Sequence, residues 1–76
     1  DLNMHVNNAV YLIWAAESLP QNFTSVPKQI RINFLEEVMP HTNVEVLCHI
    51  DGKNSYHTLI NMNTNRECAR INIFWQ

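Results

Sequence analysis

Hydrophobic side chains fill positions 9–16 of the chain, and polar residues flank this run. Asn7 or Asn8 can cap the N-terminus of a helix, and Pro20 stops a helix just beyond the run. The pattern therefore predicts a helix from Asn8 to Leu19. Its apolar residues surround the helix axis and form no stripe, which is typical of a helix wrapped by other structure. We expect this helix at the centre of the core.

After a polar loop that ends at Pro27, the hydrophobic period changes from about 3.6 residues to about 2, which is the period of a strand. The first strand is predicted from Lys28 to Val38, and three more follow a turn at positions 39–43. The side chains expected on the core face are Ile30, Ile32 and Phe34, then Val44, Val46, Cys48 and Ile50, then Tyr56, Thr58, Ile60 and Met62, and finally Ala69, Ile71, Ile73 and Trp75. These patterns predict an α+β fold with an antiparallel sheet of about four strands and one long helix.

The register of the sheet follows from the same faces, because directly paired residues lie on one side of a sheet. This rule pairs Cys48 with Thr58, which implies a loop with an odd number of residues around Gly52. It also pairs Ile60 with Ala69, which implies a two-residue turn in the last hairpin.

Composition and charge exclude several functional classes. The 76 residues are 46% hydrophobic and 16% charged, which fits one globular domain and no disordered tail. Five basic and seven acidic side chains give a net charge of -2 at pH 7. A chain with this charge balance lacks the electrostatic footprint of a nucleic-acid or anionic-membrane binder. The hydrophobic run is also much shorter than the roughly 20 residues of a membrane span.

The two cysteines indicate a reducing compartment. Cys48 and Cys68 supply neither a disulfide framework nor a zinc site. Alternation puts Cys48 on the core face and Cys68 on the opposite one, so we expect no disulfide between them. We predict a cytoplasmic protein without a cofactor. The chain begins at Asp1 and not at a methionine, which is compatible with an upstream segment.

Asp1, Asn3 and His5 recur at every second position just before the predicted helix. In an extended segment these three side chains project from one side. The helix N-terminus that follows carries free N–H groups and a partial positive charge, which can stabilise an oxyanion. Spacing alone leaves two interpretations open: a catalytic wall of carboxylate, amide and imidazole, or turn residues beside a hydrogen-bonded histidine.

The segment from Asp1 to Pro20, DLNMHVNNAVYLIWAAESLP, resembles the segment that opens the C-terminal half of acyl-acyl carrier protein thioesterases. In that family an Asp-x-Asn-x-His-Val-Asn-Asn run precedes a Tyr-x-x-Trp helix that ends in Glu-Ser-x-Pro. The segment from Ile30 to Pro40 resembles the family's next strand, which ends in a catalytic acidic residue. The resemblance implies a hotdog fold, a curled antiparallel sheet around one long helix. It also implies that the domain's first strand and an N-terminal hotdog, which forms most of the acyl tunnel, precede this chain.

The resemblance implies catalytic roles for four residues of this sequence. Asp1, Asn3 and His5 match the family's Asp, Asn and His, and Glu37 matches its Glu. Glu36 is the competing choice for the glutamate. Alternation places Glu37 on the face opposite the apolar residues of its strand, so it must reach the site across the strand end or from a bulge.

Hydrolysis of an acyl thioester needs a base for the attacking water, donors for the carbonyl oxygen and release of a thiolate. Glu37 or His5 can take the proton from water, and helix N–H groups can hold the oxyanion. Asn3 would orient the water or the carbonyl, and Asp1 would orient Asn3 or His5. Plant members of the family carry a cysteine directly after the glutamate, but this chain has Val38 there. We therefore expect direct attack by water.

Other side chains have a structural interpretation that is more common than the functional one. His49 and His57 face each other in the predicted register, but without a third ligand they indicate solvated histidines on the outer sheet face. Trp14 and Trp75 can line an acyl pocket or pack in the core. Four basic residues can bind an acidic carrier protein or the phosphate of pantetheine, or they can belong to an ordinary solvated sheet face. They are Lys28, Arg31, Arg66 and Arg70.

The sequence thus favours hydrolysis of fatty acyl-acyl carrier protein thioesters, in the cytoplasm or in the stroma of a plant plastid. The expected partners are acyl carrier protein and a missing N-terminal hotdog or homodimer partner. Two alternatives stay open. One is a single-hotdog acyl-CoA thioesterase, a family that often shares an Asp-x-x-x-His opening and usually relies on that Asp and not on a distal Glu. The other is a non-catalytic module that binds acyl chains or a carrier protein.

Overall fold

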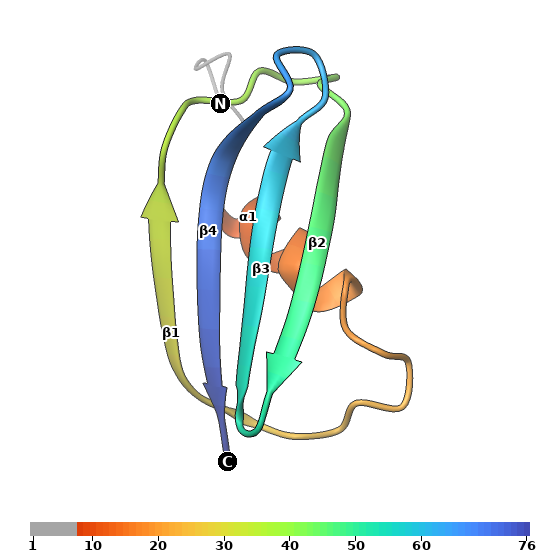
Figure 1. The fold of residues 1–76 in the computed structure, drawn as a ribbon, viewed down its shortest axis with the longest axis vertical. Coiled ribbons are helices and arrows are strands. Elements are labelled where there is room, and N and C mark those ends of the chain that lie inside the picture. The colour runs from red at the N-terminus through yellow and green to blue at the C-terminus, as the bar shows by residue number, and fades with distance from the viewer. Residues whose placement is uncertain (1–7) are drawn as a thin grey trace.

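The computed structural model describes residues 8–76, which form one helix against one face of a four-stranded antiparallel sheet (Figure 1). The elements follow one another as α1 (Asn8–Glu17), β1 (Pro27–Phe34), β2 (Val44–Asp51), β3 (Asn54–Asn61) and β4 (Arg66–Trp75). The strand order in the sheet is β1-β4-β3-β2, so β1 and β2 are the outer strands of the described sheet. The predicted α+β class with four antiparallel strands is confirmed.

The helix α1 is shorter and less enclosed than the sequence predicts. It spans 10 residues and ends at Glu17, so the prediction of a long helix to Leu19 is wrong for the described residues. The backbone N–H of Ser18 is shared between the carbonyls of Trp14 and Ala15, each at 3.2 Å, which tightens the last turn. Ala15 is buried, whereas Ile13 is 54% exposed. The helix therefore covers the sheet with one side only and does not lie at the centre of the core.

The core lies between α1 and the two inner strands of the sheet, β3 and β4. As predicted, the inward side chains of β4 are Ala69, Ile71, Ile73 and Trp75, and all four are buried. Val44 and Val46 of β2 pack against this cluster, which confirms the predicted face of the second strand. Trp75 is a core residue, and Trp14 packs against the core from the helix.

The predicted face of β3 is wrong. Its inward residues are Ser55, His57, Leu59 and Asn61, whereas Tyr56 and Met62 are exposed and Thr58 and Ile60 are half-buried. The strand carries apolar residues on both faces, and its inward polar side chains have hydrogen-bond partners that alternation does not reveal.

This change of face changes the two hairpins. Cys48 pairs with His57 and not with Thr58, and Asp51 pairs with Asn54, so the loop at Gly52 has two residues and not an odd number. Gly52 has a φ of 60°, which a type II′ turn requires at its first central position.

In the last hairpin, the pairing of Ile60 with Ala69 and the two-residue turn at Thr64 and Asn65 are also wrong. Ala69 pairs with Leu59, and Ile60 pairs with Glu67. A four-residue turn at positions 62–65 joins β3 to β4. The register shift leaves Cys68 as the extra residue of a β-bulge, and the bulge changes which side chains of β4 point inward.

The first strand keeps its predicted face but not its predicted length. Ile30, Ile32 and Phe34 pair with Ile73, Ile71 and Ala69, and residues paired in this way share the core face. The strand ends at Phe34 and not at Val38. The next four residues form an irregular segment, which carries both candidate glutamates.

Candidate active site

Three of the four predicted catalytic residues, Asp1, Asn3 and His5, lie outside the described residues, as does Asn7, one of the two candidate caps. The fourth, Glu37, is described and exposed. It belongs to the segment 35–38, which runs from the end of β1 toward the N-terminal end of α1.

The bulge of β4 determines where β1 ends. The carbonyl of Cys68 accepts hydrogen bonds from two successive backbone amides, those of Leu35 at 2.9 Å and Glu36 at 3.2 Å. Two donors on one carbonyl interrupt the regular ladder and turn the chain away from the sheet. Glu37 therefore does not follow the alternation of β1, and the sequence-based argument about its face does not apply.

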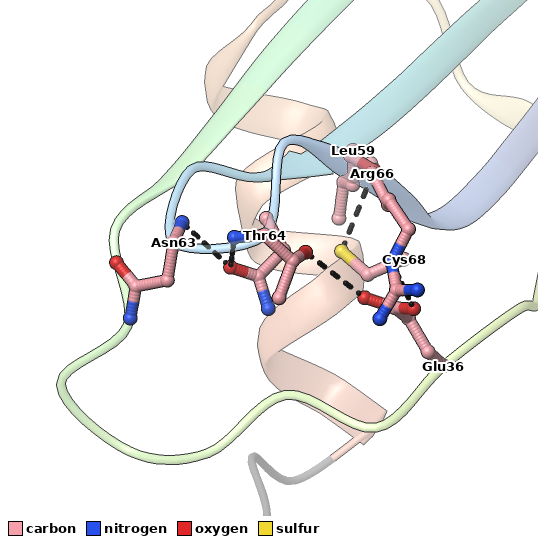
Figure 2. A network of polar contacts seen from close by, with 7 residues as sticks. Glu36, Leu59, Asn63, Thr64, Arg66 and Cys68 are labelled. Atoms are coloured by element: carbon pink, nitrogen blue, oxygen red, sulfur yellow. Dashed lines mark hydrogen bonds and ion pairs between the residues drawn. The ribbon is translucent and has the colours of Figure 1, made fainter.

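Glu36 is bound to the β3–β4 turn. Its carboxylate accepts a hydrogen bond from Thr64 Oγ1 at 3.2 Å and forms an ion pair with Arg66 Nε at 3.3 Å (Figure 2). The turn itself is closed by Asn61, whose side-chain oxygen accepts hydrogen bonds from the backbone amides of Asn63 and Thr64. Glu36 thus has a structural partner for each carboxylate oxygen, both supplied by the β3–β4 hairpin.

Tyr11 connects α1 to the segment that carries Glu37. Its ring is 3% exposed and lies edge-on to Phe34, with centroids 5.2 Å apart. Burial raises the pKa of the Tyr11 hydroxyl, the Cys68 thiol adds to this effect, a hydrogen bond from the Val38 backbone lowers the pKa, and the nearby Glu37 carboxylate raises it further. The Glu37 carboxylate is therefore within electrostatic range of the first turn of α1, the end of the helix dipole that favours negative charge.

Cys68 is not suited to act as a nucleophile. Its side chain is fully buried, whereas the sequence predicts it on the outer face, and the bulge is the reason for the difference. The thiol donates a hydrogen bond to the carbonyl of Leu59 at 3.4 Å. Burial raises the pKa of Cys68, and the Glu36 carboxylate raises it further, so the thiolate is disfavoured. Cys48 is a half-buried free thiol on β2.

Comparison with known families decides the assignment. A family model described as acyl-ACP thioesterase C-terminal domain matches residues 1–76. The chain belongs to this family. No curated protein matches the sequence significantly. The resemblance seen in the sequence is thereby confirmed over the whole chain.

The thioesterase domain also contains a buried polar network that the sequence does not predict. The Trp75 indole donates to Ser55 Oγ at 2.9 Å, and Ser55 Oγ lies 2.7 Å from His57 Nε2. On the other side of the ring, His57 Nδ1 lies 2.8 Å from Ser18 Oγ, whose hydroxyl donates to the Ala15 carbonyl at 2.6 Å. Because the Ser18 proton is used in the bond to Ala15, the Ser18 oxygen must accept a hydrogen bond from His57 Nδ1–H. The other ring nitrogen, Nε2, then carries no proton and accepts a hydrogen bond from Ser55. Burial lowers the pKa of His57, which agrees with a neutral ring.

His57 therefore lies in the core and not on the outer face, and the predicted opposition of His49 and His57 is wrong. His49 pairs with Tyr56, and their rings stack with centroids 6.3 Å apart. Among residues 8–76, no group of three histidine, cysteine, aspartate or glutamate side chains is arranged to hold a metal ion. A histidine facing inward from a strand has no signal in the sequence other than the serines that bind it.

The outer face of the sheet, which points away from α1, contains a groove of about 450 Å³. Arg31 and Arg70 line it from neighbouring strands and are diagonal neighbours, because Arg31 pairs with Asn72 and Asn33 pairs with Arg70. Arg70 forms an ion pair with Glu67 at 2.6 Å, and Arg31 has no ion-pair partner among the described residues.

No helix in the described part of the thioesterase domain is long and apolar enough to cross a membrane.

Proposed function

We propose that the protein hydrolyses fatty acyl-acyl carrier protein thioesters and releases free fatty acid. The observation that supports this most is the position of Glu37, which lies between Glu36, bound to the β3–β4 hairpin, and Val38, buried in one core cluster with Tyr11 of the helix that follows the Asp1–Asn3–His5 run. In the family that the chain resembles, residues at these four positions form the catalytic set. The proposal brings them together at the N-terminal end of α1.

The proposed mechanism is a direct attack by water. Glu37 or His5 takes a proton from water while the oxygen adds to the thioester carbonyl, a contribution of about 10²- to 10⁴-fold in rate. N–H groups at the helix N-terminus hold the oxyanion, at about 3 kcal/mol per donor. The C–S bond then breaks, and the departing thiolate takes a proton. Asn3 orients the water or the carbonyl, and Asp1 orients Asn3 or His5.

The proposal also concerns the domain organisation and the partners of the complete protein. We propose that residues 1–76 are the C-terminal hotdog of a double-hotdog enzyme, or one hotdog of a homodimer, and that a further strand completes the sheet. Acyl carrier protein is the proposed partner, and the Arg31–Arg70 groove offers positive charge for its acidic surface or for its pantetheine phosphate. Fatty acid synthesis in the cytoplasm or a plastid is the setting that this substrate implies.

The test is turnover of acyl thioesters by the complete natural protein, monitored through the release of free thiol. Acyl-acyl carrier protein should be hydrolysed with a higher kcat/KM than the matching acyl-CoA. A preference for acyl-CoA would favour the single-hotdog alternative. Tight binding of either substrate without measurable turnover would replace the enzyme by the non-catalytic binding module.

A further inference from the structure

We infer that Glu36 is a positioning residue, which through Arg66 and Thr64 of the β3–β4 turn holds the strand-end segment so that Glu37 is presented beside α1. The inference rests on the proposed function, because the position of Glu37 affects catalysis only if Glu37 acts on substrate. The ion pair therefore links a turn at one end of the sheet to the reaction.

Glu36 is held from three directions by a single hairpin. Its two carboxylate oxygens contact Thr64 Oγ1 at 3.2 Å and Arg66 Nε at 3.3 Å (Figure 2). Its backbone amide donates to the Cys68 carbonyl at 3.2 Å. Thr64, Arg66 and Cys68 lie within five positions of one another, and the bulge at Cys68 fixes their spacing. The contacts therefore act as one unit.

The residue on the other side of Glu37 is also fixed. Val38 is completely buried and belongs to the same core cluster as Tyr11 of α1. A residue whose two neighbours are both anchored has few backbone conformations available. The carboxylate of Glu37 is therefore presented from a defined backbone, although its own side chain is exposed. Loss of the Glu36 anchor would release one of the two ends.

Because the Glu36–Arg66 ion pair is partly exposed, its effect on the position of Glu37 can be distinguished from its effect on global stability. The side chain of Arg66 is 70% exposed and that of Glu36 is 26% exposed. An ion pair of this kind adds little to global stability. Misplacement of a catalytic group by about 1 Å can nevertheless lower the rate about 10²-fold. The pair should therefore affect kcat much more than the temperature of unfolding.

The experiment compares Glu36→Gln and Arg66→Gln in the complete protein acting on an acyl-acyl carrier protein. Each should lower kcat about 10- to 100-fold, with KM and the unfolding temperature close to wild type. The matched control is Glu67→Gln, which breaks the Glu67–Arg70 ion pair of 2.6 Å on the same strand. This control should change kcat by less than about 2-fold.

A charge swap tests whether the contact itself matters. The double variant Glu36→Arg/Arg66→Glu should recover most of the kcat that either single exchange loses. Glu37→Gln is measured alongside to separate the two ideas. If Glu37→Gln abolishes turnover while the Glu36 and Arg66 variants keep a wild-type kcat, the positioning role is wrong and the proposed function stands. If Glu37→Gln itself keeps wild-type turnover, both are wrong.

Discussion

At the scale of single residues, His57 is a titratable side chain buried in the core of the domain. Both ring nitrogens bind serine hydroxyls, and the side chain is 1% exposed. Protonation would place a hydrogen on Nε2, where Ser55 now donates, and would leave the Ser55 proton without an acceptor. The network therefore stabilises the neutral ring and opposes charge in the core.

The network predicts that stability falls on acidification. The pKa of His57 is lowered in the folded state, so below about pH 6.5, the ordinary pKa of histidine, the unfolded chain binds a proton that the folded chain does not. The contribution of His57 is complete above that pH and decreases as the pH falls toward the lowered value. Urea unfolding of the complete protein at pH 7.5 and 5.5 should show the lower stability at pH 5.5.

The variants identify the residue responsible. His57→Gln should be less stable at pH 7.5 and should depend less on pH, because its side chain does not titrate. His49→Gln, at an exposed position of β2, should keep the wild-type dependence. Equal stability of the wild-type protein at both pH values would contradict the assignment of a neutral, buried His57.

Cys68 provides the second prediction at this scale. Its thiol is fully buried and its pKa is raised, so Cys68→Ser should leave kcat within about 2-fold of wild type. The serine hydroxyl can still donate to the Leu59 carbonyl. Cys48 lies half-buried on β2, and Cys48→Ser should leave kcat equally unchanged. Mass spectrometry during turnover should detect no acylated cysteine. An acyl-enzyme trapped on either thiol would contradict direct attack by water.

At the scale of secondary structure, the sequence predicts which elements exist better than how they pair. Helix, loop and four strands follow from hydrophobic period and turn residues. The face of β3 does not, because Tyr56 and Ile60 give its outer side the stronger apolar signal, while Ser55 and His57 are compatible with the core only through hydrogen bonds. An error of one residue in β3 then changes both hairpins.

The candidate site is also only partly predictable from the sequence. The motif at Asp1, Asn3 and His5 and the glutamate near the end of the first strand are visible in the sequence through family resemblance. The distinct roles of Glu36 and Glu37 are not, because they depend on the bulge at Cys68. A bulge is set by three-dimensional pairing and has no reliable sequence pattern here.

The β2–β3 turn gives a prediction at this scale. Gly52 has a φ of 60°, and a Cβ at this position would have no atom within 4 Å. Gly52→Ala therefore meets backbone strain without a clash and should lower the free energy of unfolding by about 1 kcal/mol. Lys53→Ala, one residue further on, should change it by less than about 0.5 kcal/mol. Equal stability of Gly52→Ala and the wild-type protein in urea would show that the turn has a different conformation.

At the scale of the whole molecule, the described structure leaves apolar surface on the helix side of the sheet uncovered. Ile13, Ile30 and Phe34 are each about half-exposed although they belong to the helix or to the core face of β1. Both outer strands of the described sheet also present unpaired edges, and such edges favour association. These features fit a domain that packs against another unit.

We therefore predict that the isolated 76-residue chain is weakly stable or self-associated. Sedimentation at micromolar concentration should show dimers or larger species, or urea should unfold the monomer with a low midpoint. A dilute monomer with a free energy of unfolding of about 5 kcal/mol or more, the range of ordinary native domains, would show that residues 1–76 need no partner.

The most direct test of the catalytic assignment is the single-turnover rate of acyl-acyl carrier protein hydrolysis by Glu37→Gln in the complete protein. The exchange keeps the size of the side chain and removes its charge, so the fold should be retained and circular dichroism should match that of the wild-type protein. We predict a rate lower by about 10²- to 10⁴-fold. A Glu37→Gln protein that is folded, binds the substrate and hydrolyses it at the wild-type rate would contradict the account.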